Sequence, residues 1–369
     1  MDNDRPLQIS DVNDILTALP TINENATFWM IRANKGEYYT DFVMNQYVGI
    51  GYDEISLKDA QTKTNEQMTQ IFHEKKPKDK DEHPIPSGTY TSWIGQLRRF
   101  ANEIKPGDYV LVPGISSDRF SLGVVLGQPF EITSDELNHV EEIKNRKFSP
   151  YKKRIKVQFL RSFNRSEADP ALYKMIYTQT TVSKIDKYIP YILRAVFDAY
   201  ISGKKVYLTF PVTQKEDIEA LPYTEFTYNL TASYSAIAPE EKPIIKNNVQ
   251  SAGVVQLILA LSAPTGIFGL TLVVLRSKLG FTIDVNFSEG KFRFIKEANG
   301  VVAQRIKNEE TDRVIKEQNA KDDHLEKMIK LANQANVPMD DIKAKISSEL
   351  IEATKKAATP DDDNQDNPK

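Results

Sequence analysis

Short runs of large apolar residues, separated by turn signals, recur through the first 160 residues and predict β-strands. Trp93, Leu97 and Phe100 fall at helical spacing and predict a helix with one apolar face. The pattern therefore predicts a domain with both helices and strands over residues 26–160, behind a polar leader at 1–25. The predicted strands occupy residues 28–32, 48–52, 109–112, 120–126 and 156–160.

Residues 161–245 continue with a mixed α/β pattern. Apolar positions within 182–199 predict a helix that Pro190 interrupts, and residues 206–210 predict a strand ended by Pro211. The pattern leaves open whether this α/β extension belongs to the first domain or forms a domain of its own.

No ionisable side chain occurs between residues 249 and 275. The length matches a membrane span of about 20 residues, and Pro264 and Gly266 lie near its middle, where a helix would kink. Three alternatives stay open for the apolar segment 249–276: one kinked transmembrane helix, a hairpin of two short helices, or a buried core hairpin. Basic residues after the segment would keep that side in the cytoplasm, and a single span would then export a first domain that has no export signal.

The chain beyond this segment predicts a short β-hairpin at 281–296, because residues 281–287 alternate with a period of two. Residues 300–357 are charged and predict helices, the last of which has Pro338 in its first turn. One face of that helix would carry Met339, Ile342, Ile346 and Leu350, a pattern typical of packing or of self-association into a homo-oligomer. The acidic tail at 358–369 is expected to be disordered.

The composition and the absence of known motifs exclude several kinds of catalytic and metal site. The chain of 369 residues has a net charge of −3 and no cysteine, which excludes disulfides, thiolate catalysis and zinc sites built on cysteine. Phosphate-loop, nucleophile-elbow and metalloprotease motifs are absent, and the four histidines lack metal-ligand spacing. We therefore predict no catalytic residue, no metal site and no cofactor, and favour a binding protein while leaving an unfamiliar enzyme open.

The first residues lack the apolar core of a signal peptide, so a cytoplasmic or inner-membrane-associated protein is expected.

Aromatic residues are concentrated in the first domain, together with both tryptophans of the chain. Most belong in a core, but some could form the walls of a pocket in which a base stacks. The candidate ligand-binding residues are Trp29, Arg32, Tyr38, Trp93, Gln96 and Arg99. A basic stretch supplies candidate contacts to a nucleic-acid backbone, although an exposed strand entry would have the same composition. These residues are Arg146, Lys147, Lys152, Lys153 and Arg154.

Several short motifs follow one another in a familiar order. They are Trp-Met-Ile-Arg at 29–32, Gly36, Phe42, Val-Gly-Ile-Gly at 48–51, Trp-Ile-Gly-Gln-Leu-Arg-Arg-Phe at 93–100, Ile-Lys-Pro-Gly-Asp-Tyr-Val at 104–110 and Leu-Gly-Val-Val at 122–125. In this order they resemble PUA-like domains of the EVE type, as found at the N-termini of restriction-like prokaryotic defence proteins. The resemblance implies a small β-barrel with helices at its openings. It also implies binding of nucleic acid, often through a modified base held in an aromatic pocket.

Two functional hypotheses follow from the pattern and the resemblance. The first is a non-catalytic sensor of prokaryotic antiviral defence that recognises a modified base or a nucleotide-derived ligand and perturbs the membrane through residues 249–276. The alternative is a soluble modified-DNA-binding protein that recruits a partner nuclease. No nuclease domain follows the first domain, so the layout, not a motif, points to a membrane-acting module.

Overall fold

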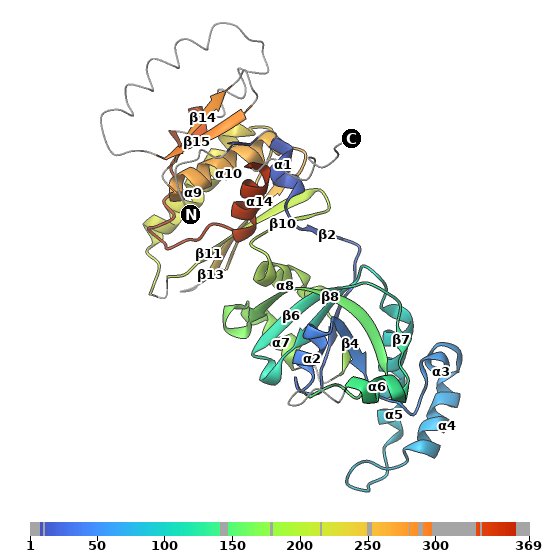
Figure 1. The fold of residues 1–369 in the computed structure, drawn as a ribbon. Helices are drawn as coiled ribbons and strands as arrows, with labels where there is room; N and C mark the ends of the chain where they lie inside the picture. The colour runs from blue at the N-terminus through green and yellow to red at the C-terminus, as the bar shows by residue number, and fades with distance from the viewer. Residues whose placement is uncertain are drawn as a thin grey trace, which may run out of the picture. The chain divides into compact units, whose positions relative to one another are not determined.

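The computed structural model describes residues 8–9, 12–140, 147–177, 180–214, 216–248, 253–279, 281–286, 291–296, 330–332 and 334–358. The chain forms two compact units (Figure 1). The middle unit is Asn25–Val196, and the terminal unit combines Met1–Glu24 with Phe197–Lys369. Each contains helices and strands, so the α+β class is correct.

The middle unit is built on one sheet with strand order β4-β8-β6-β5-β3-β9, and β7 also pairs with β8. β3 and β5 run parallel, and the other pairs are antiparallel. The strands are β3 (Phe28–Ile31), β4 (Tyr47–Ile50), β5 (Tyr109–Pro113), β6 (Arg119–Val125), β7 (Phe130–Glu131), β8 (Lys153–Asn164) and β9 (Val182–Lys184).

The long strand β8 curves through this sheet (Figure 1). Its first residues pair with β4 on one side and β7 on the other, and its remainder pairs with β6 through a register shift at Leu122 and Gly123. A register shift bends a strand and increases its twist. A curved sheet with helices is the coarse architecture that the sequence resemblance implies.

The predicted first domain ends too early. Residues beyond 160 complete β8, and β9 pairs with β3, so this sheet is finished only at Lys184. The predicted extension 161–245 is therefore divided between the two units.

The helices of the middle unit lie between its strands in sequence. They are α2 (Tyr39–Met44), α3 (Leu57–Thr62), α4 (Asn65–Lys75), α5 (Ser87–Arg98), α6 (Ser134–Val140), α7 (Tyr173–Ile176) and α8 (Ile189–Val196). A π-helical turn, Arg99–Glu103, continues α5, and short 3₁₀ turns occupy Ile115–Ser117, Arg165–Glu167, Pro170–Leu172 and Asp186–Tyr188. α5 begins at Ser87, directly after Pro86, and so extends further toward the N-terminus than the predicted apolar face of Trp93, Leu97 and Phe100.

The terminal unit has a sheet of order β12-β13-β11-β10-β2, built from both ends of the chain. These strands are β2 (Thr21–Ile22), β10 (Ala199–Ser202), β11 (Lys205–Val212), β12 (Ile244–Asn248) and β13 (Gly253–Ala260), and β2 runs parallel to β10. A smaller sheet joins β1 (Gln8–Ile9), β15 (Lys291–Lys296) and β14 (Phe281–Asn286), the last two pairing antiparallel. The helices are α1 (Val12–Thr17), α9 (Ala220–Ile237), α10 (Pro264–Leu279) and α14 (Ser348–Ala358).

Residues 253–276 of the uncharged segment form a strand, a turn and a helix, so the membrane-spanning helix and the pairing of two helices are wrong, whereas the predicted burial in a core is confirmed. β13 lies between β11 and β12, and α10 starts at Pro264, which therefore sits in a first turn instead of kinking a helix. Val255, Leu257 and Phe268 are buried in the core of the terminal unit. Among the residues that the structure describes, no helix is long and apolar enough to cross a membrane.

The last predicted helix is also displaced. Residues from Pro338 to Ser347 contain no helix, and α14 starts at Ser348. Met339, Ile342 and Leu350 are buried in the core of the terminal unit, so they do not form a free stripe for self-association. Residues 300–329 of the predicted charged helical region and residues 359–369 of the predicted acidic tail lie outside the described residues.

Truncating a side chain of β13 tests its place in the core. Leu257→Ala should lower the free energy of unfolding by about 2–5 kcal/mol, because it removes a fully buried leucine and leaves a cavity. Urea denaturation of the full chain measures this loss. Ile244→Ala is the control, since Ile244 on the neighbouring strand is 47% exposed and should change stability far less. Equal stability for both variants would contradict the assignment.

Candidate functional site

The turn after β4 has an uncommon backbone. Tyr52 has φ = +64°, a left-handed conformation that a large non-glycine side chain adopts only when its surroundings hold it there. The Lys153 ammonium supplies that constraint: Nζ lies 3.1 Å from the Tyr52 carbonyl oxygen and 2.9 Å from Asp53 Oδ1. The direction of the Tyr52 side chain therefore depends on Lys153.

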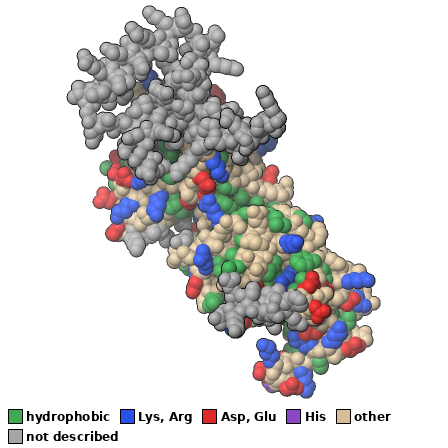
Figure 2. Space-filling model, in the orientation of Figure 1, with side chains coloured by type: hydrophobic (Ala, Val, Ile, Leu, Met, Phe, Trp, Pro, Cys, Tyr) green, Lys and Arg blue, Asp and Glu red, His purple; other side chains and the backbone are tan. Residues whose placement is uncertain are grey.

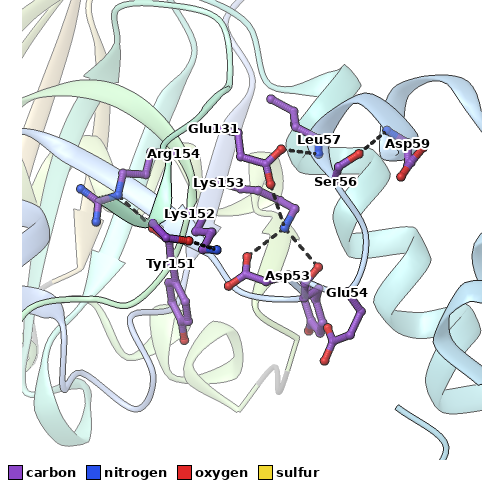
Figure 3. Close-up of polar contacts among 12 residues, drawn as sticks. Asp53, Glu54, Ser56, Leu57, Asp59, Glu131, Tyr151, Lys152, Lys153 and Arg154 are labelled. Carbon is purple, nitrogen blue, oxygen red and sulfur yellow. Dashed lines mark hydrogen bonds and ion pairs between the residues drawn. The ribbon is translucent and has the colours of Figure 1, made fainter. Parts of the chain in front are cut away.

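Lys153 is fully buried, and its ammonium points between two carboxylates (Figure 3). Besides Asp53, it has Glu131 Oε1 of β7 at 3.7 Å. The second oxygen of Glu131 accepts the Leu57 N–H at 2.9 Å, at the start of α3. A buried ammonium is costly unless it is paired and hydrogen-bonded, so this network locks β7, β8, the Tyr52 turn and α3 together.

Four partly exposed aromatic side chains, the aromatic cluster, surround this turn. Its members are Tyr38, Tyr52, Trp93 and Tyr151, all packed against the core of the middle unit. The rings of Tyr52 and Trp93 are 5.6 Å apart between centroids at 39°, and those of Tyr38 and Tyr151 are 5.4 Å apart at 83°. Such separations are those of favourable ring contacts.

Glycine allows the Tyr151 ring to lie against the end of β4. A Cβ added at Gly51 would stand 3.2 Å from Tyr151 Cε1, closer than almost all real Cβ contacts. At Gly49 it would stand 3.0 Å from the Lys153 carbonyl oxygen. Any other residue would displace the ring or the neighbouring strand.

Two tyrosine hydroxyls of the cluster, those of Tyr52 and Tyr151, stay neutral. Burial raises the pKa of Tyr151 to about 12 and also raises the pKa of Tyr52 above its usual value. Both hydroxyls therefore keep their protons at neutral pH and can donate as well as accept hydrogen bonds. Tyr52 Oη lies 3.5 Å from Thr181 Oγ1.

Trp93 is held from several sides. Phe72 and Tyr90 have ring centroids 5.4 and 5.7 Å from it. Lys76 Nζ lies 5.2 Å from the centroid of the Trp93 ring and is itself 3.0 Å from Glu54 Oε1. The indole is thus positioned before any ligand arrives, with a cation beside it.

The structure gives Trp29 a different role from the predicted one. Its side chain is 2% exposed, and Nε1 donates to Asp108 Oδ2 at 2.9 Å. Asp108 also accepts the backbone N–H groups of Thr27 and Lys105, so this contact ties β3 to the turn before β5. Trp29 is therefore a core residue, not a pocket wall.

Arg32, Gln96 and Arg99 converge on one stretch of backbone. Arg32 Nη2 donates to the Ile176 carbonyl, and Arg99 Nη1 donates to the Val182 carbonyl at 3.5 Å. Gln96, which is 4% exposed, accepts the N–H groups of Thr181 and Val182 with its side-chain oxygen. These three predicted ligand contacts position the chain that leads into β9 and carries Thr181.

The predicted basic set does not act as one patch. Arg146 lies outside the described residues, and Lys147 pairs with Glu37 at 2.9 Å. Lys152 Nζ donates to Ser134 Oγ at 2.9 Å. The buried ammonium of Lys153 is not available to a phosphate, which corrects its predicted role. On the face shown in Figure 2, basic and acidic side chains are interspersed over the middle unit.

One group of potential metal ligands occurs within the described ranges: Asp79, Asp81 and His83. All three are exposed on the loop between α4 and α5, and Asp79 Oδ1 already accepts the backbone N–H groups of the other two. Its carboxylate shapes the loop, and nothing else in the described part of the chain marks this group as a metal site.

The residues missed by the sequence analysis are Tyr52 and Tyr151. Tyr52 directly follows Val-Gly-Ile-Gly, so the two glycines were the available signal for an aromatic residue beside a close backbone approach. Tyr151 stands beside the basic stretch and carries no signal of its own. Its position depends on β8 pairing with β4, a contact between segments about a hundred residues apart.

Comparison with known proteins gives a family of unknown function and a distant solved structure. The model of a domain of unknown function (DUF8426) matches residues 29–186, which is less than half of the chain but contains every residue of the aromatic cluster. A comparison with curated proteins gives no match. One solved structure that resembles the chain is the YTH domain of the Zygosaccharomyces rouxii MRB1 protein in complex with N6-methyladenosine RNA. It is 13% identical over 48% of this chain and 85% of that chain, with a TM-score of 0.24, too low to support any conclusion.

Removing the buried ammonium tests the network. Lys153→Met should lower the free energy of unfolding by on the order of 3 kcal/mol, because it leaves Asp53, Glu131 and the Tyr52 carbonyl without their shared partner. Lys152→Met is the matched control, since this neighbouring side chain is partly exposed and should change stability by less than about 0.5 kcal/mol. Chemical denaturation measures both, and similar losses would refute the role given to Lys153.

Proposed function

We propose that the middle unit binds a nucleobase, in a nucleic acid or a nucleotide-derived ligand, by stacking it on the aromatic cluster. The observation that carries this proposal is the exposure of the four rings at one turn. Several large aromatic side chains of the unit, namely Phe42, Phe100 and Phe120, are at most 1% exposed. Tyr38, Tyr52, Trp93 and Tyr151 instead keep part of their surface toward solvent.

Stacking supplies enough affinity for such a site. Each base that stacks on an aromatic face gains about 1–3 kcal/mol. Lys153 holds the Tyr52 turn, and Phe72 and Tyr90 pack against Trp93, so little ordering is needed when a base binds. A preformed site of this kind suits the capture of a base that has left its stack.

Neutral polar groups of the cluster would provide selectivity. The protonated hydroxyls of Tyr52 and Tyr151 can pair with donors or acceptors on a base edge. Three polar side chains contribute indirectly in this proposal, those of Arg32, Gln96 and Arg99. They hold the backbone around Thr181, whose side chain contacts Tyr52. The cluster would distinguish a modified base by its shape and hydrogen bonding. The charged groups of the ligand would lie outside the cluster.

The structure bears on only one of the other functional hypotheses from the sequence, the membrane-perturbing effector. The membrane-perturbing effector is not carried forward, because residues 253–279 form a strand and a helix of the terminal unit. A sensor role in antiviral defence, recruitment of a nuclease and assembly into a homo-oligomer stay predictions that rest on the sequence alone.

Removing the Tyr52 ring tests the proposal. Tyr52→Asn should weaken binding about 5- to 150-fold, the equivalent of 1–3 kcal/mol of stacking. Asparagine tolerates the left-handed backbone, so the variant removes the ring without adding strain. The measurement is fluorescence anisotropy with short labelled single-stranded DNAs and RNAs that carry either an unmodified base, a methylated adenine or a modified cytosine.

Two further variants complete the experiment. Tyr151→Phe keeps the ring and removes the hydroxyl, so it should reduce discrimination between modified and unmodified strands more than overall affinity. Tyr228→Asn is the control, because Tyr228 on α9 is 68% exposed and belongs to the terminal unit. Binding of no probe by the folded wild-type chain, or equal binding by Tyr52→Asn, would disprove the proposal.

A further inference from the structure

A groove with a volume of about 450 Å³ is lined by the start of β4, by β7 and by the start of β8. Its walls include Tyr47, Leu126, Phe130, Arg154 and Lys156. The volume falls within the range of about 300–1,000 Å³ that small-molecule sites occupy. The groove is separate from the aromatic cluster, which contributes no side chain to its wall.

Arg154 is fixed at the centre of this groove. Its guanidinium carbon lies 4.1 Å from the centroid of the Tyr47 ring, Nε donates to the Tyr151 carbonyl at 2.9 Å, and Nη2 donates to the Ser149 carbonyl at 3.2 Å. A guanidinium held in this way keeps its charge and loses little freedom when it binds an anion. Lys156 stands two residues along β8, on the same face, and is exposed.

The charges around the groove favour an anion. Asp41 also lines it but is 6% exposed, and its carboxylate already accepts hydrogen bonds from the Tyr47 hydroxyl, Asn45 Nδ2 and the Ser149 N–H. Glu136 of α6 is close enough to interact with Arg154. Its carboxylate accepts two hydrogen bonds from Thr133, one from the backbone N–H and one from the hydroxyl. Both carboxylates are thus engaged, whereas Lys156 presents its ammonium to solvent.

The remaining wall is apolar. Leu126 is 56% exposed, and Phe130 is partly exposed. A cationic side and an apolar side together fit a ligand that has an anionic group and a flat ring. A nucleotide has both.

The groove and the aromatic cluster are linked through β4 and β8. Tyr47 lies on β4 with Gly49, and Gly51, which follows the strand, leaves room for the Tyr151 ring where a Cβ would crowd it. Arg154 holds the carbonyl of that same Tyr151. The groove and the aromatic cluster are therefore supported by the same pair of strands.

We infer that the groove is a second nucleotide subsite, which binds the neighbour of the base stacked at Tyr52 and makes single-stranded nucleic acid the ligand. Its phosphate lies on Arg154 and Lys156, and its ring packs on Leu126 and Phe130. This inference rests on the proposed function. It adds the polymer and a second point of contact with it.

Two groove variants test the subsite with the labelled single-stranded DNA that the wild-type chain binds most tightly. Lys156→Gln should weaken binding and lower the slope of log affinity against log salt by about 0.7, the value for one phosphate contact in a single strand. Leu126→Asn should weaken binding about 5-fold or more through lost apolar contact with the ring, with an unchanged salt slope. Neither should alter affinity for the corresponding free nucleoside, measured by tryptophan fluorescence.

Lys105→Gln is the matched control, because it removes an equivalent charge from an exposed lysine in the turn before β5. Wild-type strand affinity and salt slope in both groove variants, with binding still lost in Tyr52→Asn, would overturn the subsite and leave the proposed function intact. Equal affinity of the wild-type chain for the strand and for the matching duplex would also overturn it. Failure of the wild-type chain to bind either strand or nucleoside would overturn both proposals.

Discussion

The pairing of the Lys153 ammonium with Asp53 and Glu131 is the constraint on which the middle unit most depends. It brings a charge to full burial and in exchange connects two strands, a turn and a helix start. A charged network of this kind seldom maximises stability, since well-packed apolar residues often replace it without loss. Its value here lies in fixing one backbone conformation, that of Tyr52, which apolar packing would leave less sharply defined.

The aromatic cluster follows from that conformation. Tyr52 packs against Trp93. Of the two residues before it, Ile50 is buried in the core, and Gly51 leaves room for the Tyr151 ring. The polar side chains nearest the cluster then serve the backbone around Thr181 instead of facing solvent. The polar side chains beside the site are held by hydrogen bonds, while its aromatic residues are partly exposed. This combination suits a planar, uncharged ligand.

Local pattern was enough to locate most strands of the middle unit, because apolar runs such as 109–112 and 120–126 are bounded by clear turn signals. It failed where pairing partners decide the structure. Residues 254–259 are apolar enough for a helix, yet β11 and β12 enclose them as a strand. At the site, sequence identified Tyr38 and Trp93, but the burial of Lys153 and Trp29 depends on partners distant in sequence that no local pattern reveals.

The terminal unit is discontinuous in sequence, since β2 precedes the middle unit and its partner β10 follows it. During synthesis the middle unit is complete once Val196 has left the ribosome, whereas β2 and α1 still lack every partner they have in the terminal unit. Domains generally fold as units, in the order in which they emerge. β2 therefore waits for β10, and α1 waits for α10 and α14, so a delay late in translation prolongs the period in which α1 lacks its partners.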